Sequence, residues 1–165
     1  MDIQAICGWL QATALATSVR ESSFLFPSVE ALHVLAVAFV AGSVAVVDLR
    51  LLGVTAFNRS ILQLMHDVLP FTWSAFGCAV LTGSILLSSA AVSYSRNLPF
   101  RLKMIFLALA AINMLLFHTT TCREISHWDE AIRTPMPARL AGAASLLLWI
   151  LIIACGRWIG FANSG

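Results

Sequence analysis

The sequence predicts an all-α integral membrane protein, a four-helix bundle with an amphipathic N-terminal helix at the membrane interface. Its 165 residues are 59% hydrophobic and only 11% charged, whereas soluble domains are roughly 45 to 50% apolar and about 25% charged. Four apolar stretches each provide about the 20 residues that an α-helix needs to cross ~30 Å of hydrocarbon. Inside lipid a helix satisfies its own backbone hydrogen bonds, so the stretches are interpreted as helices and not strands.

The predicted spans cover residues 27–52, 70–94, 100–120 and 138–161 of a single domain, residues 1–165. Pro70 suits the first turn of the second span, because a proline there needs no backbone partner. Before the first span, Ile3, Ile6 and Leu10 share one face of a helix over about residues 1–20. Such a weakly amphipathic helix is typical of the membrane interface. Residues 60–69 predict another short surface helix.

Composition and motifs exclude several classes of function. The ten basic residues are scattered and the net charge is only +2, so no basic stripe favours nucleic-acid binding. The sequence has no Gly-rich phosphate loop, no His-Glu-x-x-His motif and no nucleophile elbow. The spacing of its four cysteines matches neither paired zinc motifs nor a disulfide framework. We therefore predict no catalytic residue and favour a non-enzymatic role.

Polar side chains at membrane depth are the main candidates for a site, because an unpaired charge there is costly. The candidates are Glu30, His33, Asp48, Arg50, Lys103, Asn113, Ser145 and Arg157. The first three share one broad helical face that should look inward. Lys103 and Arg157 lie near the same surface as Glu30 and could neutralise it, while Arg50 could reach the headgroups. For each charge, a structural role and a functional role both remain open.

Small residues four apart predict where helices pack, because lipid gives helices no hydrophobic reason to associate and close backbone approach must hold them together. The predicted pairs are Ala38 with Gly42, Ala79 with Gly83, and Ala141 with Ser145.

A metal site is a further hypothesis. Met114, His118 and Cys122 recur every four residues and so lie on one helical face. His66 and His127, in connections on the same side of the membrane, could complete a site for copper or zinc. The alternative is that the methionine packs against its neighbours and the cysteine is a small buried hydrophobe.

Haem is the other cofactor that the histidines suggest, because a four-helix bundle can clamp a haem between histidines. The candidates are His33 and His118. At ~1.5 Å per residue they would lie about 18 Å apart along the membrane normal, whereas two imidazoles on one iron need nitrogens only ~4 Å apart. A single haem would therefore need another ligand, such as Met104.

Several motifs together resemble an uncharacterised bacterial family of small four-span membrane proteins. They are ALHVLAVAFVAGSVAVVDLRLLG, LP at 69–70, TG at 82–83, YSRNLPFRLKM, AIN and LLFH in the third span, SLLLW and GRWIGF. The ordered residues that carry the resemblance are His33, Asp48, Arg50, Tyr94, Asn97, Phe100, Lys103, Asn113, His118, Ser145, Trp149 and Arg157. The resemblance covers nearly the whole chain and implies a multi-pass protein of the bacterial inner membrane.

A histidine early in the first span with a glycine nine residues later is similar, more distantly, to two other bacterial families. These are the copper-resistance membrane domain and the haem-linked protoporphyrinogen oxidase. The similarity implies haem b or copper as a cofactor.

Three functions follow as hypotheses. The first is a protein that binds haem or a transition metal for redox or copper handling. The second is a small transporter or channel that uses the intramembrane polar residues. The third is a structural or assembly subunit. In each case the expected partner is the lipid bilayer, together with a second copy of the chain or another membrane complex in the third.

Overall fold

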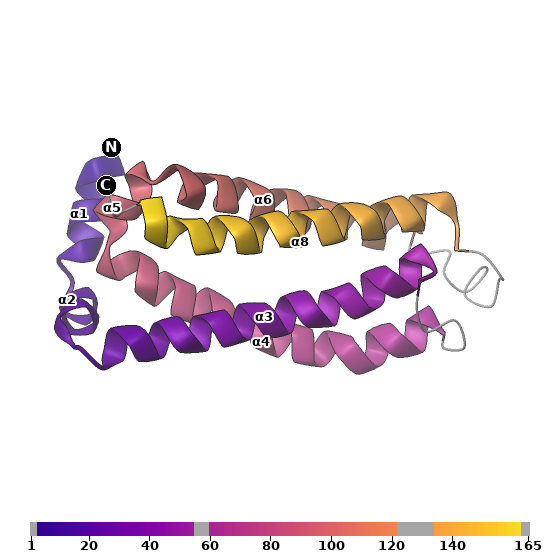
Figure 1. Ribbon diagram of the computed structural model, residues 1–165, viewed down its shortest axis with the longest axis horizontal. Helices are drawn as coiled ribbons and strands as arrows, with labels where there is room; N and C mark the ends of the chain where they lie inside the picture. Colours follow the sequence, from indigo (N-terminus) through magenta and orange to yellow (C-terminus); the bar gives the residue numbers. More distant parts are fainter. Residues whose placement is uncertain (1–2, 55–59, 122–133, 163–165) are drawn as a thin grey trace.

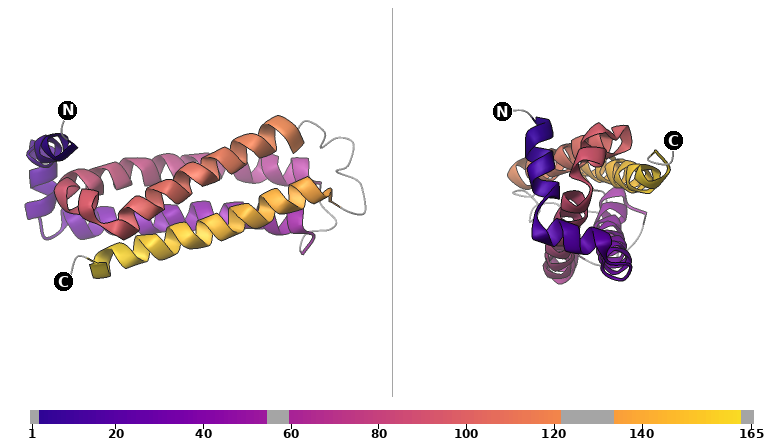
Figure 2. Two further views of the ribbon diagram at one scale, coloured as in Figure 1. Left: turned by 90° about the horizontal axis from the view of Figure 1, so that it is seen from above. Right: turned by 90° about the vertical axis from the view of Figure 1, so that its left-hand side faces the viewer.

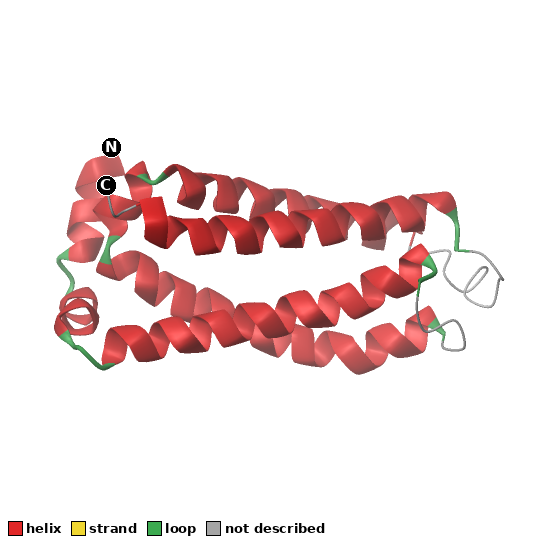
Figure 3. Cartoon of the chain, in the orientation of Figure 1, coloured by secondary structure: helices red, strands yellow, loops and turns green. Residues whose placement is uncertain are grey.

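The computed structural model describes residues 3–54, 60–121 and 134–162, and every element in these ranges is a helix (Figure 3). Four helices are long and apolar enough to cross a membrane. They are α3 (Leu25–Leu52), α4 (Ile61–Ser89), α6 (Leu98–Leu116) with the π-helical turn η1 (Phe117–Thr121), and α8 (Met136–Ala162). They run alternately in opposite directions along the bundle (Figure 1). The predicted all-α fold with four apolar helices is confirmed.

The bundle consists of two helix pairs. Helix α3 packs most extensively along α4, and α6 packs along α8, while contacts between α3 and α8 join the pairs. All four meet in one hydrophobic cluster of Leu51, Ile61, Phe117 and Ala138. We call this end of the bundle the core end. The opposite end, where α1 and α2 lie, is the cap end (Figure 1).

Two short helices, α1 (Ile3–Gln11) and α2 (Ala14–Glu21), lie across the cap end (Figure 2). The sequence predicted one helix here, and the break has a local cause. Thr13 adopts an extended backbone, and its hydroxyl accepts a hydrogen bond from the N–H of Ala16 at 3.4 Å. Threonine in that role starts a new helix. Trp9 is 71% exposed, as an interfacial helix requires.

Polar contacts fasten this cap to the end of α4 and to the short helix α5 (Ala91–Arg96). The Arg20 guanidinium donates to the carbonyl oxygen of Ser89 at 3.4 Å. The N–H of Val92 donates to the side-chain oxygen of Gln11 at 3.2 Å. The cap is therefore tied to the bundle by hydrogen bonds that the amphipathic pattern did not reveal.

The bounds of α4 differ from the prediction. The helix begins at Ile61, where the Ser60 hydroxyl accepts from the N–H of Gln63 at 3.3 Å, so residues 60–69 are not a separate surface helix. Pro70 consequently lies inside α4. A proline there removes one backbone hydrogen bond, which membrane helices tolerate. The helix ends at Ser89, and Tyr94 belongs to α5.

The small-residue motifs gave two correct predictions and one wrong one. Ala79 is buried, and the Cα of Gly83 lies against an α3 side chain. Ala141 packs on the core cluster. By contrast, Ala38 is exposed and no atom of another element lies within 4 Å of a Cβ built on Gly42. The spacing alone could not distinguish a helix face that meets protein from one that faces outward.

Candidate functional site

A layer of polar side chains crosses the cap half of the bundle. It contains one residue from each long helix: His33, Thr82, Lys103 and Cys155. At ~1.5 Å per residue, each lies about 7 to 12 Å from the cap end of its own helix. We call these four residues the polar layer. Polar side chains within apolar helices are the default candidates for a functional site in a membrane protein.

Thr82 orients the imidazole of His33. Their Nδ1 and Oγ1 atoms are 3.0 Å apart. The Thr82 hydroxyl proton is already donated to the carbonyl oxygen of Cys78 at 2.7 Å, so its oxygen accepts the proton on Nδ1. The carbonyl of Ala79, which can only accept, also faces the ring. With its proton on Nδ1, the neutral imidazole keeps its lone pair on Nε2.

Gly83 leaves room for the His33 imidazole to lie against α4. A Cβ at this position would lie 2.9 Å from Cε1 of His33 and 3.4 Å from Nδ1. Any larger residue would therefore displace the ring. The adjacent Thr82 and Gly83 thus act together, one by hydrogen bonding the ring and the other by making room for it.

Lys103 brings a positive charge into the same layer. Its side chain is partly buried and lies along α8, where a Cβ on Gly156 would be 3.6 Å from Nζ. The ammonium group interacts electrostatically with His33 and Cys155. Within the described residues, no carboxylate lies within 4.0 Å of it.

A second polar cluster lies toward the core end. Asp48 is buried, the hydroxyl of Ser145 faces its carboxyl group from α8, and its Oδ2 atom has no hydrogen-bond partner in the described part of the chain. Nearby, the side-chain amide of Asn113 donates to the carbonyl oxygen of Ala141 at 3.1 Å. Gly142 allows α8 to approach α3 closely here, because a Cβ on Gly142 would be 3.2 Å from the backbone oxygen of Asp48.

Three charged side chains differ from the prediction in their exposure or in their contacts. Glu30 is exposed and does not face inward, and neither Lys103 nor Arg157 forms an ion pair with it among the described residues. Arg157 instead lies over the ring of Phe161, with 5.4 Å from Cζ to the ring centroid. Arg50 is buried, so it does not reach toward headgroups. Position along the helix did not show how these side chains are placed around the helix axis.

Tyr94 lies beside Glu30 at the cap end and outside the apolar helices. Its ring stacks on Phe100, with centroids 5.4 Å apart. Burial and the charge of Glu30 together raise the pKa of the Tyr94 hydroxyl above its ordinary value.

The predicted metal site is not assembled by the described residues. Nδ1 of His118 is 3.0 Å from the backbone oxygen of Met114, and the Met114 side chain is exposed. The side chain of His66 on α4 is 91% exposed. Cys122 and His127 lie outside the described residues. Among residues 3–54, 60–121 and 134–162, no three histidine, cysteine or acidic side chains are grouped as metal ligands.

The candidate haem ligands lie in different parts of the bundle. His33 belongs to the cap half of α3 and His118 to η1 at the core end (Figure 1), so the two cannot share an iron, as their depths predicted. Met104 is 49% exposed. His33 is the candidate that the structure places among other polar groups.

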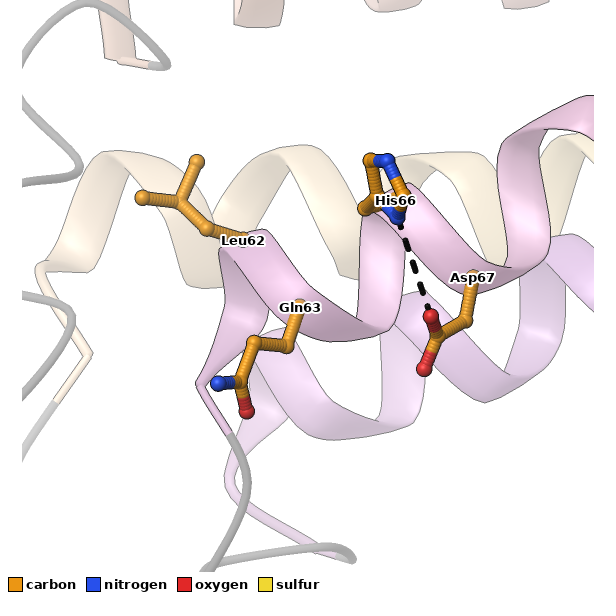
Figure 4. A pocket seen from close by; sticks show the side chains of 4 residues that line it. All are labelled: Leu62, Gln63, His66 and Asp67. Carbon is orange, nitrogen blue, oxygen red and sulfur yellow. Dashed lines mark ion pairs between the residues drawn. The ribbon is translucent and has the colours of Figure 1, made fainter.

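A pocket of about 470 Å³ lies at the core end of α4 and is lined by Leu62, Gln63, His66 and Asp67 (Figure 4). His66 and Asp67 form an ion pair at 3.8 Å when the histidine is protonated. Both side chains are largely exposed, so the pair is weak. The hollow is an open surface far from the polar layer, and we assign it no chemistry.

Sequence reasoning missed Thr82 and Cys155 as members of the layer. Neither residue is unusual in a membrane helix, and Thr82 was singled out only as part of the TG motif at 82–83. A hydroxyl that pairs with an imidazole 49 positions away along the chain can be recognised only after the helices are placed side by side.

With this geometry established, comparison with known proteins gives one result. The model of a family of unknown function (DUF6644) matches residues 22–162. The chain belongs to this family. The match contains the polar layer and all four apolar helices, but neither α1 nor α2. No curated protein and no solved structure matches the chain.

Proposed function

We propose that the protein is a membrane-embedded binding protein for a redox cofactor, haem or a transition metal such as copper, with His33 as the ligand residue. The observation that carries the proposal is the hydrogen bond between His33 Nδ1 and Thr82 Oγ1. Histidines that bind metals typically donate their second ring N–H to a neighbouring acceptor, which fixes the tautomer and the ring orientation. His33 has that arrangement, and its Nε2 lone pair is left for a metal.

The surroundings of His33 support the same proposal. His33 is only partly buried in the chain alone, so part of this residue is accessible to a cofactor. The other members of the layer offer a thiol and an ammonium group, which suit a polar or anionic ligand. We place the protein in the bacterial inner membrane, where quinones and haem proteins would be its neighbours.

The test is an absorption spectrum with elemental analysis of the detergent-purified full chain, followed by titration with hemin and with Cu(I). We expect a Soret band or bound copper, lost in His33→Ala and kept in His66→Ala, whose histidine is exposed on α4. Thermal unfolding of both variants separates loss of the ligand from loss of the fold. A folded wild-type protein that takes up neither hemin nor copper would contradict the proposal.

Transport is a second candidate, favoured by Asp48. A buried carboxyl oxygen without a hydrogen-bond partner inside an apolar bundle is costly, and such residues often mark an ion or proton path. The test is cation flux in liposomes containing the wild-type protein, Asp48→Asn, or the control Asp67→Asn, whose carboxylate is exposed on α4. Flux that survives in Asp48→Asn, or no flux in the wild type, removes this candidate.

A further inference from the structure

Lys103 is the basic residue of the polar layer whose ammonium group has not yet been matched to a particular group of the ligand. Its ammonium lies between α6 and α8, against Gly156, and within the described residues no carboxylate is close enough to pair with it. A charged side chain that is partly buried between apolar helices without a partner is unfavourable. A bound ligand that carries a negative charge would remove that cost.

The position of Lys103 relative to His33 limits what that ligand can be. Both side chains lie in the polar layer, and they interact electrostatically. A bare metal ion held by His33 would add positive charge beside the ammonium, which is unfavourable. A ligand that combines a metal centre for His33 with a carboxylate for Lys103 satisfies both groups.

We propose that Lys103 binds a carboxylate of the cofactor, so that the ligand of the polar layer is an anionic porphyrin such as haem and not a free copper ion. This inference rests on the proposed function, because it assigns the class of ligand that His33 binds. The role of Lys103 is to position the porphyrin and to neutralise one of its carboxylates. Gly156 contributes by leaving the ammonium room to lie against α8.

The inference can be tested by changing the ligand and the protein in parallel. The purified full chain is titrated with hemin and with hemin dimethyl ester, in which methyl groups block both carboxylates. The variants are Lys103→Met, which keeps length and loses charge, and Arg101→Met, a control that removes an exposed charge from the same helix. Affinity is measured from the Soret band, whose position also reports ligation by His33.

We expect the wild-type protein to bind hemin about tenfold or more tightly than the ester, in line with the strength of a partly buried charge pair. Lys103→Met should lose about that factor for hemin and nothing for the ester, with an unchanged Soret position. Arg101→Met should bind hemin as the wild type does. Copper affinity should rise or stay constant in Lys103→Met, because the variant removes a like charge.

Two results would overturn the inference while the proposed function survives. One is equal affinity of the wild type for hemin and its ester. The other is an equal loss of both ligands in Lys103→Met, which would show that the lysine acts only through the structure. If neither porphyrin binds the folded wild-type protein, the Lys103 inference fails, and binding of Cu(I) alone would leave His33 as a copper ligand.

Discussion

His33 and Thr82 join two membrane-length helices through one side-chain hydrogen bond, with 3.0 Å between Nδ1 and Oγ1. The bond does two things at once. It satisfies two polar side chains inside an apolar bundle, and with Nδ1 as the donor it leaves the lone pair on Nε2. The geometry of this pair therefore leads to the first prediction.

Thr82→Val should weaken cofactor binding at His33 by about tenfold or more, because loss of the partner of a metal-bound histidine typically costs 10- to 100-fold in affinity. Thr82→Ser keeps the hydroxyl and should bind as the wild type does. Hemin and Cu(I) titrations of the three proteins check the prediction. Equal affinity in Thr82→Val would show that the hydrogen bond only packs α3 against α4.

Gly83→Ala should displace the His33 ring, because the new Cβ would lie 2.9 Å from Cε1. We expect a loss of about 1 to 3 kcal/mol of stability from this overpacking and weaker cofactor binding. Gly77→Ala on the same helix is the matched control, since no atom of another element lies within 4 Å of its Cβ position. Thermal unfolding in detergent measures both variants, and similar midpoints for the two would refute the steric argument.

Gly142→Ala should separate α3 from α8 at the core end. Its Cβ would be 3.2 Å from both the backbone oxygen of Asp48 and Cβ of Leu51, so backbone must move. Small residues at such contacts hold membrane helices together, and we expect roughly 1 to 3 kcal/mol of destabilisation.

The control for Gly142→Ala is Gly160→Ala, also on α8, where a Cβ meets nothing within 4 Å. Unfolding in a denaturing detergent titration compares the two. If Gly142→Ala unfolds at the same detergent concentration as the wild type, the helix pairs are joined by other contacts.

Tyr94 predicts a pH dependence of stability. Burial and Glu30 raise its pKa in the folded protein, so the folded state keeps the phenol proton at a pH where the unfolded state, with a pKa of about 10, has lost it. The stabilisation is complete below pH ~10 and is lost as the pH rises through the folded value. The unfolding midpoint of the wild type should thus fall above pH ~10, and that of Tyr94→Phe should fall less. Parallel alkaline curves for the two proteins would exclude Tyr94 as the cause.

Much of the architecture could be predicted from the sequence because its signals are local. Long apolar runs must become helices in lipid, whatever their neighbours, so the four candidate spans were found with small errors in their bounds. The largest error, at α4, arose because Pro70 was taken as a helix start. Proline is favoured there but is also tolerated inside a membrane helix whose backbone is shielded from water.

The candidate site could be predicted only in part. Their positions within the apolar stretches identified His33, Lys103 and Asp48 as polar groups inside apolar helices. It could not show that Glu30 points outward or that Arg50 is buried, since these depend on how each helix is rotated against its neighbours.

The amino-acid sequence by itself determined that this chain forms four apolar helices and where along its helix each polar residue lies, because hydrophobicity and helical rise are properties of each segment alone. Tertiary structure decided which of those residues meet. Thr82 pairs with His33, Lys103 lies against Gly156, and Asp48 approaches Gly142 only because two helix pairs pack at particular rotations. Those rotations are set by contacts between segments distant in the chain, which no local pattern records.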